Sequence, residues 1–441
     1  MREMKDSGVE WIGEIPKDWS TIRLKYLLTK KKNSIKVGPF GSQIKGNDFV
    51  DEGVPVYTQR TVLDDDFING DAFITKEKYS LLKGFEVEPL DFLITTRGSI
   101  GRVAIAPEDV RPGIIHPCII KFTIDRNIYN DQLLKYIFNG SDMILEQLVL
   151  ASNATTIPVV YSEPLKNVII PMAPYNQQQK IVRYLNEECT KIDAVIKKQQ
   201  AIIEKLKEYK LSIITEKVSN GLNPCVSTKY SGNEFIGSIP SHWKCVKIKN
   251  VSIVVTDGAH VSPETENGVY DFISTVNVEQ DHIDFDNCLK TTESSYQYLV
   301  STGCRPLSGD VLISKDGSVG RTVIVNTDRD FVVSSSLVII RPNIEMITSE
   351  YLNFILQSAF VQETLLMLMH GAGLRRVSVN KNANLPVLLP PIEEQKDIVK
   401  YLEKKCSDIE KDITKRRTIV EELFMYKKSI IFEAVTGKKE I

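Results

Sequence analysis

The chain has 441 residues, of which 42% are hydrophobic, so it is long enough for two or three packed domains. The formal net charge of −2 excludes a chain that is basic throughout, so any nucleic-acid contact must be a local patch. The seven cysteines form no C-x-x-C pair, which argues against zinc ribbons and a disulfide framework. Without a signal peptide or a long apolar run, we expect a soluble, cytoplasmic protein with no membrane contact.

The first predicted elements are a lead-in and a globular segment in which strands and helices mix. The lead-in is WIGEIPKDWSTIRLKYL at residues 11–27. A Gly-Pro loop at 37–46 is followed by predicted strands over 54–63, 114–124 and 168–174, a strand–turn–strand unit over 90–106 and a helix over 131–151. This order predicts an α+β domain.

A long heptad repeat comes next, from Gln177 to Gly221, with no proline inside it. Lys and Glu occupy the outer faces of the helix. Its seam residues recur every seven positions: Leu185, Ile192, Gln199, Leu206 and Ile213. Such a helix is roughly 65 Å long at 1.5 Å per residue. A helix of that length needs a partner of comparable length or serves as a spacer.

The second half of the chain repeats the first. A second lead-in at 235–251, a strand–turn–strand unit at 310–325 and a helical stretch at 349–371 precede a second heptad repeat that starts at Glu394. The seam returns 217 positions later, from 185 to 402, at Leu402, Ile409, Arg416, Leu423 and Ile430. Two unrelated exposed helices do not explain this match over forty residues, so we infer an internal duplication.

The duplication divides the chain into four predicted segments. Two globular domains occupy residues 1–174 and 222–391, and two long helices that pair with each other occupy 175–221 and 392–441. The framework repeats but the loops do not: the loop VGPFGSQIKG in the first copy corresponds to TDGAHVSPET in the second. Shared scaffolds with different loops are typical of modules that recognise different things.

Catalytic chemistry is not visible in the sequence. We find no phosphate-binding G-x-x-x-x-G-K-[ST] loop and no strand-linked G-x-G-x-x-G turn. The nearest match to the Pro-Pro tetrapeptide of amino-methyltransferases, at residues 389–392, lacks both functional ends, and the five histidines are isolated. We therefore assign no catalytic residue, no metal ligand and no cofactor to this chain.

At this point the motifs carry a family resemblance. Two [WF]-I-G-x-I-P-x-x-W lead-ins, two G-S-[IV]-G-R turns, and P-P-I-E-E-Q-x-x-I-V-x-Y-L before a long helix resemble the specificity subunit of Type I restriction-modification systems. The resemblance covers nearly the whole chain. The first copy departs from the family pattern, because Gln177-Gln178 stands where the family, like Glu394-Gln395 here, has an acidic residue before Gln.

The resemblance implies two target recognition domains that each recognise half of a split, asymmetric double-stranded DNA target. It implies an antiparallel coiled coil that sets the spacing and docks two methyltransferase subunits, with endonuclease-translocase subunits in the same assembly. Adenine N6 methylation with S-adenosylmethionine, and cleavage with ATP and Mg²⁺, belong to those partners. The alternatives are a self-contained methyltransferase or nuclease, and a coiled-coil adaptor that makes no DNA contact.

Candidate DNA contacts lie on polar loops, because Arg addresses guanine and Asn or Gln addresses adenine in the major groove. In the first domain they are Phe40, Ser42, Gln43, Lys45, Gln59, Arg60, Thr61, Thr96, Arg97, Ser99 and Arg102. In the second they are His260, Ser262, Ser274, Thr275, Asn277, Lys315, Asp316, Ser318, Arg321, Arg375 and Arg376. The alternative for each of them is a solvated loop residue that makes no DNA contact. Arg102 and Arg321 occur in both copies, which favours a framework or phosphate role.

Two polar residues occupy matching seam positions near the middle of their helices. In an antiparallel pair related by a pseudo-two-fold axis, helix midpoints cross. We therefore expect Gln199 and Arg416 to lie close together and to help fix the register. Polar side chains that point out of a loosely wound seam are the alternative.

Overall fold

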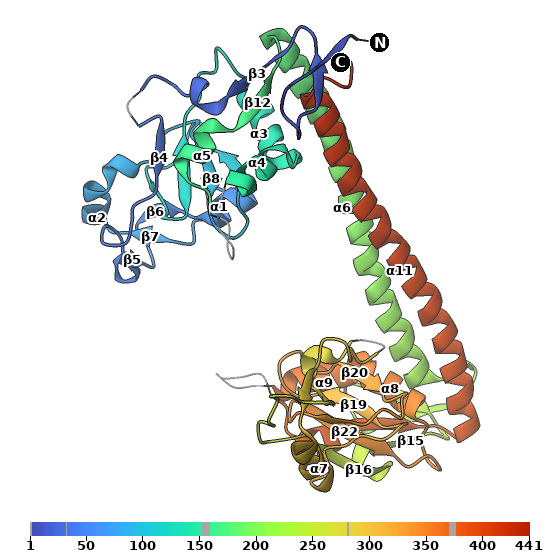
Figure 1. Cartoon of the computed structure of the whole chain (residues 1–441). Helices are drawn as coiled ribbons and strands as arrows, with labels where there is room; N and C mark the ends of the chain where they lie inside the picture. Colours follow the sequence, from blue (N-terminus) through green and yellow to red (C-terminus); the bar gives the residue numbers. More distant parts are fainter. Residues whose placement is uncertain (1, 32, 152–158, 280–281, 370–375) are drawn as a thin grey trace. The chain divides into compact units, whose positions relative to one another are not determined.

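The computed structural model describes residues 2–31, 33–151, 159–279, 282–369 and 376–441. The chain divides into two compact units, one made of Met1–Gln199 with Thr418–Ile441 and the other of Gln200–Arg417. The long helices α6 (Tyr175–Asn220) and α11 (Ile392–Val435) contribute to both units (Figure 1). The α+β class, with duplicated recognition domains and two long helices packed together, is confirmed.

The described globular part of unit 1 contains two four-stranded sheets with short helices around them. The first is antiparallel, with strand order β4 (Ile35–Val37), β11 (Ile119–Phe122), β8 (Phe92–Thr95) and β9 (Val103–Ile105). The second has the order β10 (Ile114–Ile115), β6 (Val54–Tyr57), β7 (Phe73–Ile74) and β5 (Phe49–Val50). The helices are α1 (Gln59–Asp64), α2 (Lys76–Leu81), α3 (Asp131–Gly140), α4 (Met143–Ala151) and α5 (Ser162–Asn167).

Unit 2 repeats this arrangement. Its antiparallel sheet has the order β16 (Ser252–Asp257), β22 (Leu337–Pro342), β19 (Val311–Ser314) and β20 (Thr322–Ile324). Its second sheet has the order β18 (Leu289–Thr291), β17 (Tyr270–Ile273) and β21 (Phe331–Val333). The helices are α7 (Glu293–Ser301), α8 (Ser349–Gln357), α9 (Ala359–Leu368) and α10 (Val379–Ala383).

Some predicted elements are divided in the structure. The strand predicted over 54–63 ends at Tyr57, and α1 begins at Gln59 because Thr58 caps it; the Thr58 N–H donates to Thr61 Oγ1 at 3.2 Å. The strand predicted over 114–124 becomes β10 and β11, which belong to different sheets. Each predicted helix after the sheet breaks in two, at Ser141 in unit 1 and at Ser358 in unit 2, where the backbone is extended.

The lead-ins join the long helices to the globular parts. Strand β3 (Ser20–Arg23) pairs with β12 (Ile169–Met172), and β15 (Lys244–Lys247) pairs with β23 (Pro386–Leu389). Short hairpins precede them, β1 (Met4–Asp6) with β2 (Glu14–Pro16) and β13 (Thr228–Tyr230) with β14 (Ser238–Pro240). In unit 1 the chain's C-terminal end returns to this lead-in, where Gly437 packs against Pro16 and Trp19.

A buried tryptophan in each lead-in is hydrogen-bonded to the start of the following long helix. The Trp19 indole N–H donates to Gln177 Oε1 at 2.8 Å, and the Trp243 indole N–H donates to Glu394 Oε2 at 3.1 Å. Gln177 and Glu394 are the residues at which the first copy departs from the family pattern. An amide oxygen accepts the indole N–H as a carboxylate does, so the departure preserves the contact.

The next residue along each helix is a buried glutamine that ties it to the globular part. Gln178 accepts the Asn130 N–H at 2.8 Å and donates to the Ala173 carbonyl at 2.9 Å. Gln395 accepts the Thr348 N–H at 3.0 Å and donates to the carbonyls of Pro390 and Met346, both at 2.9 Å. Asn130 and Thr348 are the N-caps of α3 and α8, so each glutamine fixes one helix to another.

The two long helices pair in antiparallel fashion within each unit. In unit 1, Lys427 Nζ lies 2.6 Å from Asp193 Oδ1; in unit 2, Lys210 Nζ lies 2.7 Å from Glu410 Oε1. From 193 to 210 is 17 residues forward along α6, and from 427 to 410 is 17 residues back along α11. One register therefore accounts for both ion pairs.

The predicted seam residues differ in how deeply they are buried. Leu185, Ile192, Ile213, Leu402, Ile409 and Ile430 are buried, whereas Gln199, Leu206, Arg416 and Leu423 are partly buried. Gln199 belongs to unit 1 and Arg416 to unit 2. Their proximity stays a prediction.

The glutamine anchor of unit 2 can be tested by truncation. Gln395→Ala removes the hydrogen-bond partner of the partly buried Thr348 N–H and of two carbonyls, and we expect a loss of about 2–4 kcal/mol in the free energy of unfolding. Urea unfolding followed by tryptophan fluorescence measures it, because Trp243 is buried beside the anchor. Gln200→Ala, at an exposed position of α6, is the matched control and should change stability by less than about 0.5 kcal/mol. Equal effects of the two substitutions would contradict the anchoring role.

Candidate nucleic-acid interface

In both units the candidate loops leave the first sheet at the same edge. Val37 at the end of β4 is opposite Ile120, and Thr95 at the end of β8 is opposite Ile119, so both strands end beside the start of β11. In unit 2, Asp257 at the end of β16 is opposite Val338, and Ser314 at the end of β19 is opposite Leu337. Strand pairing therefore brings loop 38–45 beside turn 96–101, and loop 258–262 beside turn 315–320.

The start of α1 joins this edge in unit 1. A side chain at Gly98 would meet Gln59 Nε2 at 3.3 Å, so the Gln59 amide lies against the turn that carries the exposed Arg97 and Ser99. Exposed candidates on this edge and its loops are Phe40, Ser42, Gln43, Lys45, Arg60, Arg97 and Ser99, with Gln59 partly exposed. All of these side chains are polar except the exposed ring of Phe40.

Two predicted contacts of unit 1 are buried instead. Thr61 Oγ1 accepts the Thr58 N–H inside the first turn of α1. Thr96 Oγ1 donates to the Cys118 carbonyl at 2.9 Å. Both hydroxyls satisfy backbone groups, so we regard these residues as supports of the edge and no longer as contacts.

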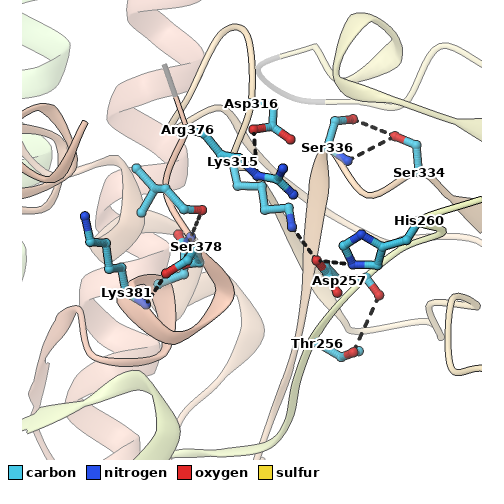
Figure 2. Close-up of polar contacts among 12 residues, drawn as sticks. Thr256, Asp257, His260, Lys315, Asp316, Ser334, Ser336, Arg376, Ser378 and Lys381 are labelled. Carbon is cyan, nitrogen blue, oxygen red and sulfur yellow. Dashed lines mark hydrogen bonds and ion pairs between the residues drawn. The ribbon is translucent and has the colours of Figure 1, made fainter. Parts of the chain in front are cut away.

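The matching edge of unit 2 carries charge, as Figure 2 shows. The buried ammonium of Lys315 is hydrogen-bonded to Asp257 Oδ2, and the exposed His260 ring places Nε2 at 2.9 Å from the same oxygen. Arg376 Nε lies 3.3 Å from Asp316 Oδ1, and these two residues also form an antiparallel bridge. His260, Ser262, Ser318 and Arg376 are exposed, and Asp316 and Ser274 are partly exposed.

Three predicted contacts of unit 2 are buried and hold the backbone or another side chain. Asn277 Oδ1 accepts the N–H and the hydroxyl of Ser274, both at 3.1 Å, and Thr275 Oγ1 donates to the Ser336 carbonyl at 3.3 Å. Lys315 is buried against Asp257. These residues shape the edge from beneath, and Arg375 lies outside the described residues.

The arginines shared by the two copies are exposed but bind different carbonyls. Arg102 Nη1 donates to the Asn139 carbonyl in α3 at 2.6 Å, and Arg321 Nη1 donates to the Val278 carbonyl at 3.4 Å. These bonds tie the tight turn to a neighbouring element, which supports the framework role inferred from their presence in both copies.

Among the residues that the structure describes, no group of three or more His, Cys, Asp or Glu side chains is placed to hold a metal ion. No helix within the described ranges is long and apolar enough to cross a membrane.

Comparison with known proteins decides the family. The model of the Type I restriction modification DNA specificity domain matches residues 16–208 and 240–417, which together are most of the chain. The chain belongs to the Type I specificity-subunit family. It is the DNA specificity subunit of a Type I restriction-modification system.

Relatives of this specificity subunit match it over most of their length. It is 22% identical to the Type I restriction enzyme EcoBI specificity subunit of Escherichia coli, over 90% of this chain and 83% of the relative. It is 24% identical to the MjaVIII specificity subunit of Methanocaldococcus jannaschii, over 96% of this chain and 93% of the relative. A chain solved in work on complex assembly and conformational transition of the type I R-M system has the same fold, with a TM-score of 0.69, 17% identity and coverage of 96% and 99%.

One residue of the edge was missed by the sequence prediction. Asp257 ends β16 and meets both Lys315 and His260, but the sequence around it, TDGAH, indicates only a loop. The order of apolar and polar residues in SIVVTD does not show on which face of the sheet Asp257 lies. Only the strand register shows that its carboxylate faces Lys315. The available signal was a charged residue that stands just before a glycine and three residues before a histidine.

The electrostatics of Asp257 follow from these partners. Burial would raise the pKa of the Asp257 carboxyl, but hydrogen bonds from Lys315 and His260 outweigh burial and lower the pKa below its ordinary value of 3.8. A carboxyl with a lowered pKa in the folded state stabilises the fold above its ordinary pKa. That stabilisation is lost as the pH falls through 3.8 toward the folded-state pKa.

This linkage gives a pH prediction for the specificity subunit. The free energy of unfolding of the wild type should fall more steeply between about pH 5 and pH 3 than that of the double variant Asp257→Asn with Lys315→Met. The double variant removes both charges together, so no buried charge is left unpaired. Urea midpoints measured along a pH series test this; parallel curves for the two proteins would contradict it.

Proposed function

We propose that this specificity subunit is non-catalytic and that its globular domains, residues 1–174 and 222–391, each recognise one half of an asymmetric bipartite DNA target. One observation carries the proposal. The same sheet edge occurs in both units, yet the exposed side chains on it differ, with Phe40 and Arg97 in one and His260 and Asp316 in the other. A repeated framework with different edges suits two half-sites of unlike sequence.

The proposed DNA contacts are the exposed and partly exposed members of the two edges. In the first domain they are Phe40, Ser42, Gln43, Lys45, Gln59, Arg60, Arg97 and Ser99; in the second they are His260, Ser262, Ser274, Asp316, Ser318 and Arg376, with Arg375 retained from the sequence. Arg102 and Arg321 support the turns and are available to phosphates. With a net charge of −2, the chain depends on its partners for much of the electrostatic affinity for DNA.

We further propose that segments 175–221 and 392–441 set the spacing between half-sites and dock two methyltransferase subunits. Two recognition modules on one stiff connection bind with a high effective concentration when the half-site spacing fits the connection. The methyltransferases use S-adenosylmethionine to methylate adenine N6 after flipping the base out of the helix. Endonuclease-translocase subunits that use ATP and Mg²⁺ cleave unmodified DNA with the specificity this chain provides.

The direct test is to map methylated adenines in genomic DNA treated with the reconstituted complex of this chain and its methyltransferase partners. We expect a two-part, asymmetric motif with an unspecified spacer, and no modification when this chain is left out. A continuous motif would contradict bipartite recognition.

The same preparation separates the two alternative functions. Methyl transfer by the purified chain alone would establish a self-contained enzyme. Modification of the same sites with and without this chain would indicate an adaptor without a role in DNA recognition.

A further inference from the structure

Two glycines mark the same point in the two recognition domains. The Gly38 N–H donates to the Ile119 carbonyl at 2.9 Å, and the Gly258 N–H donates to the Leu337 carbonyl at 3.2 Å. A Cβ atom would lie 2.2 Å from the His116 carbonyl oxygen at Gly38 and 2.1 Å from the Val333 carbonyl oxygen at Gly258. Only glycine allows the chain to pass this close to the neighbouring strand end, so both loops leave the sheet from the same place.

Two residues after each glycine stands an exposed side chain. Phe40 is 64% exposed, which is unusual for an aromatic ring. Its backbone is fixed, because the Phe40 N–H donates to Gln43 Oε1 at 3.0 Å and the Gln43 N–H donates to the Phe40 carbonyl at 2.7 Å. The turn therefore presents an apolar ring to solvent from a backbone that has little freedom.

The matching residue of unit 2 is His260, whose side chain is also 64% exposed. Here the ring itself is fixed, because Nε2 lies 2.9 Å from Asp257 Oδ2. Asp257 in turn meets the buried ammonium of Lys315, as Figure 2 shows. In unit 1 the matching residues are Val37, which ends β4, and Thr96, which follows β8, so this charged support belongs to the second copy alone.

The phenyl ring of Phe40 and the imidazole of His260 suit different bases in the major groove. An apolar side chain in the major groove contacts the thymine methyl group. A neutral imidazole that donates Nε2–H to a carboxylate leaves Nδ1 as an acceptor, which suits the amino group of adenine N6 or cytosine N4.

We propose that residues 40 and 260 are the matched specificity positions of the two recognition domains. Phe40 selects a thymine in one half-site, and His260 selects an adenine or a cytosine in the other. Asp257 and Lys315 are positioning residues that orient the His260 ring without touching DNA. The inference rests on the proposed bipartite recognition and adds to it which side chain distinguishes which base.

The test uses the complex of the full-length chain with its methyltransferase partners at pH 8, with methylated-adenine mapping as the readout. Phe40→Ala should relax one position of one half-site, where the wild type requires thymine, by about tenfold or more. His260→Ala should relax one position of the other half-site, where the wild type requires adenine or cytosine. The double variant Asp257→Leu with Lys315→Met should relax that same position, because leucine offers the His260 ring no hydrogen-bond acceptor and no buried charge is left unpaired.

Exposed apolar positions away from the loops provide matched controls. Leu81→Ala in α2 and Ile253→Ala in β16 should leave the motif unchanged. An unchanged motif for Phe40→Ala or His260→Ala would overturn the inference while leaving bipartite recognition intact. Relaxation of different positions by His260→Ala and the double variant would overturn the positioning role. A wild-type motif that is not bipartite would remove the proposed function and the inference together.

If the double variant fails to fold, His260→Ala decides the point alone, because this exposed ring can be truncated without opening the core. Thermal unfolding of each variant, measured beside the wild type, distinguishes a folding failure from a loss of base selection. A His260→Ala protein that melts with the wild type and keeps the full motif contradicts the proposal.

Discussion

The fold depends on the antiparallel pairing of α6 with α11, because these two helices belong to both compact units. A polar helix of 46 residues gains little from its own hydrogen bonds and is stabilised by burying its apolar seam. Each buried isoleucine contributes about 1.5–3 kcal/mol. The ion pairs Asp193–Lys427 and Lys210–Glu410 are partly exposed and contribute less than about 1 kcal/mol each to the stability of the fold. Their main effect is therefore to favour one register of the helix pair.

Matching hydrogen bonds at the start of each long helix connect the helix pair to the recognition domains. In each unit the first residues of a long helix bind the lead-in tryptophan and the N-cap of the next globular helix, through Gln177 and Gln178 or through Glu394 and Gln395. Both tryptophans and both glutamines that bind the N-caps are buried, and all of these groups are hydrogen-bonded, so their geometry is costly to change. The side chains proposed to contact DNA are exposed or partly exposed, so they can differ between the two domains without breaking these buried hydrogen bonds.

Much of this organisation could be predicted from the sequence, because it is periodic. The heptad seam and the repeated lead-ins are local patterns, and they identified the long helices, the duplication and the family. The shared pair Arg102 and Arg321 indicated a framework role by the same logic of repetition.

The fate of individual polar residues at the edge could not be predicted in this way. Thr61, Thr96, Thr275, Asn277 and Lys315 follow strands or turns as contact residues do, but the fold turns them inward, where they satisfy backbone groups or a carboxylate. Which way a polar side chain faces at the end of a strand depends on strand register and on partners distant in sequence. Asp257 was missed for the same reason, since its partner Lys315 is 58 residues away.

We propose above that the paired length of α6 and α11 sets the distance between the two DNA half-sites. The most direct test of this proposal is to insert one heptad into each helix at the same level, after Ile202 and after Arg417, and to map methylated adenines. Seven residues lengthen a helix by about 10.5 Å, or about three base pairs of B-DNA. We expect the same two half-sites with a spacer longer by about three base pairs. Efficient methylation of the original motif with its original spacer would contradict it.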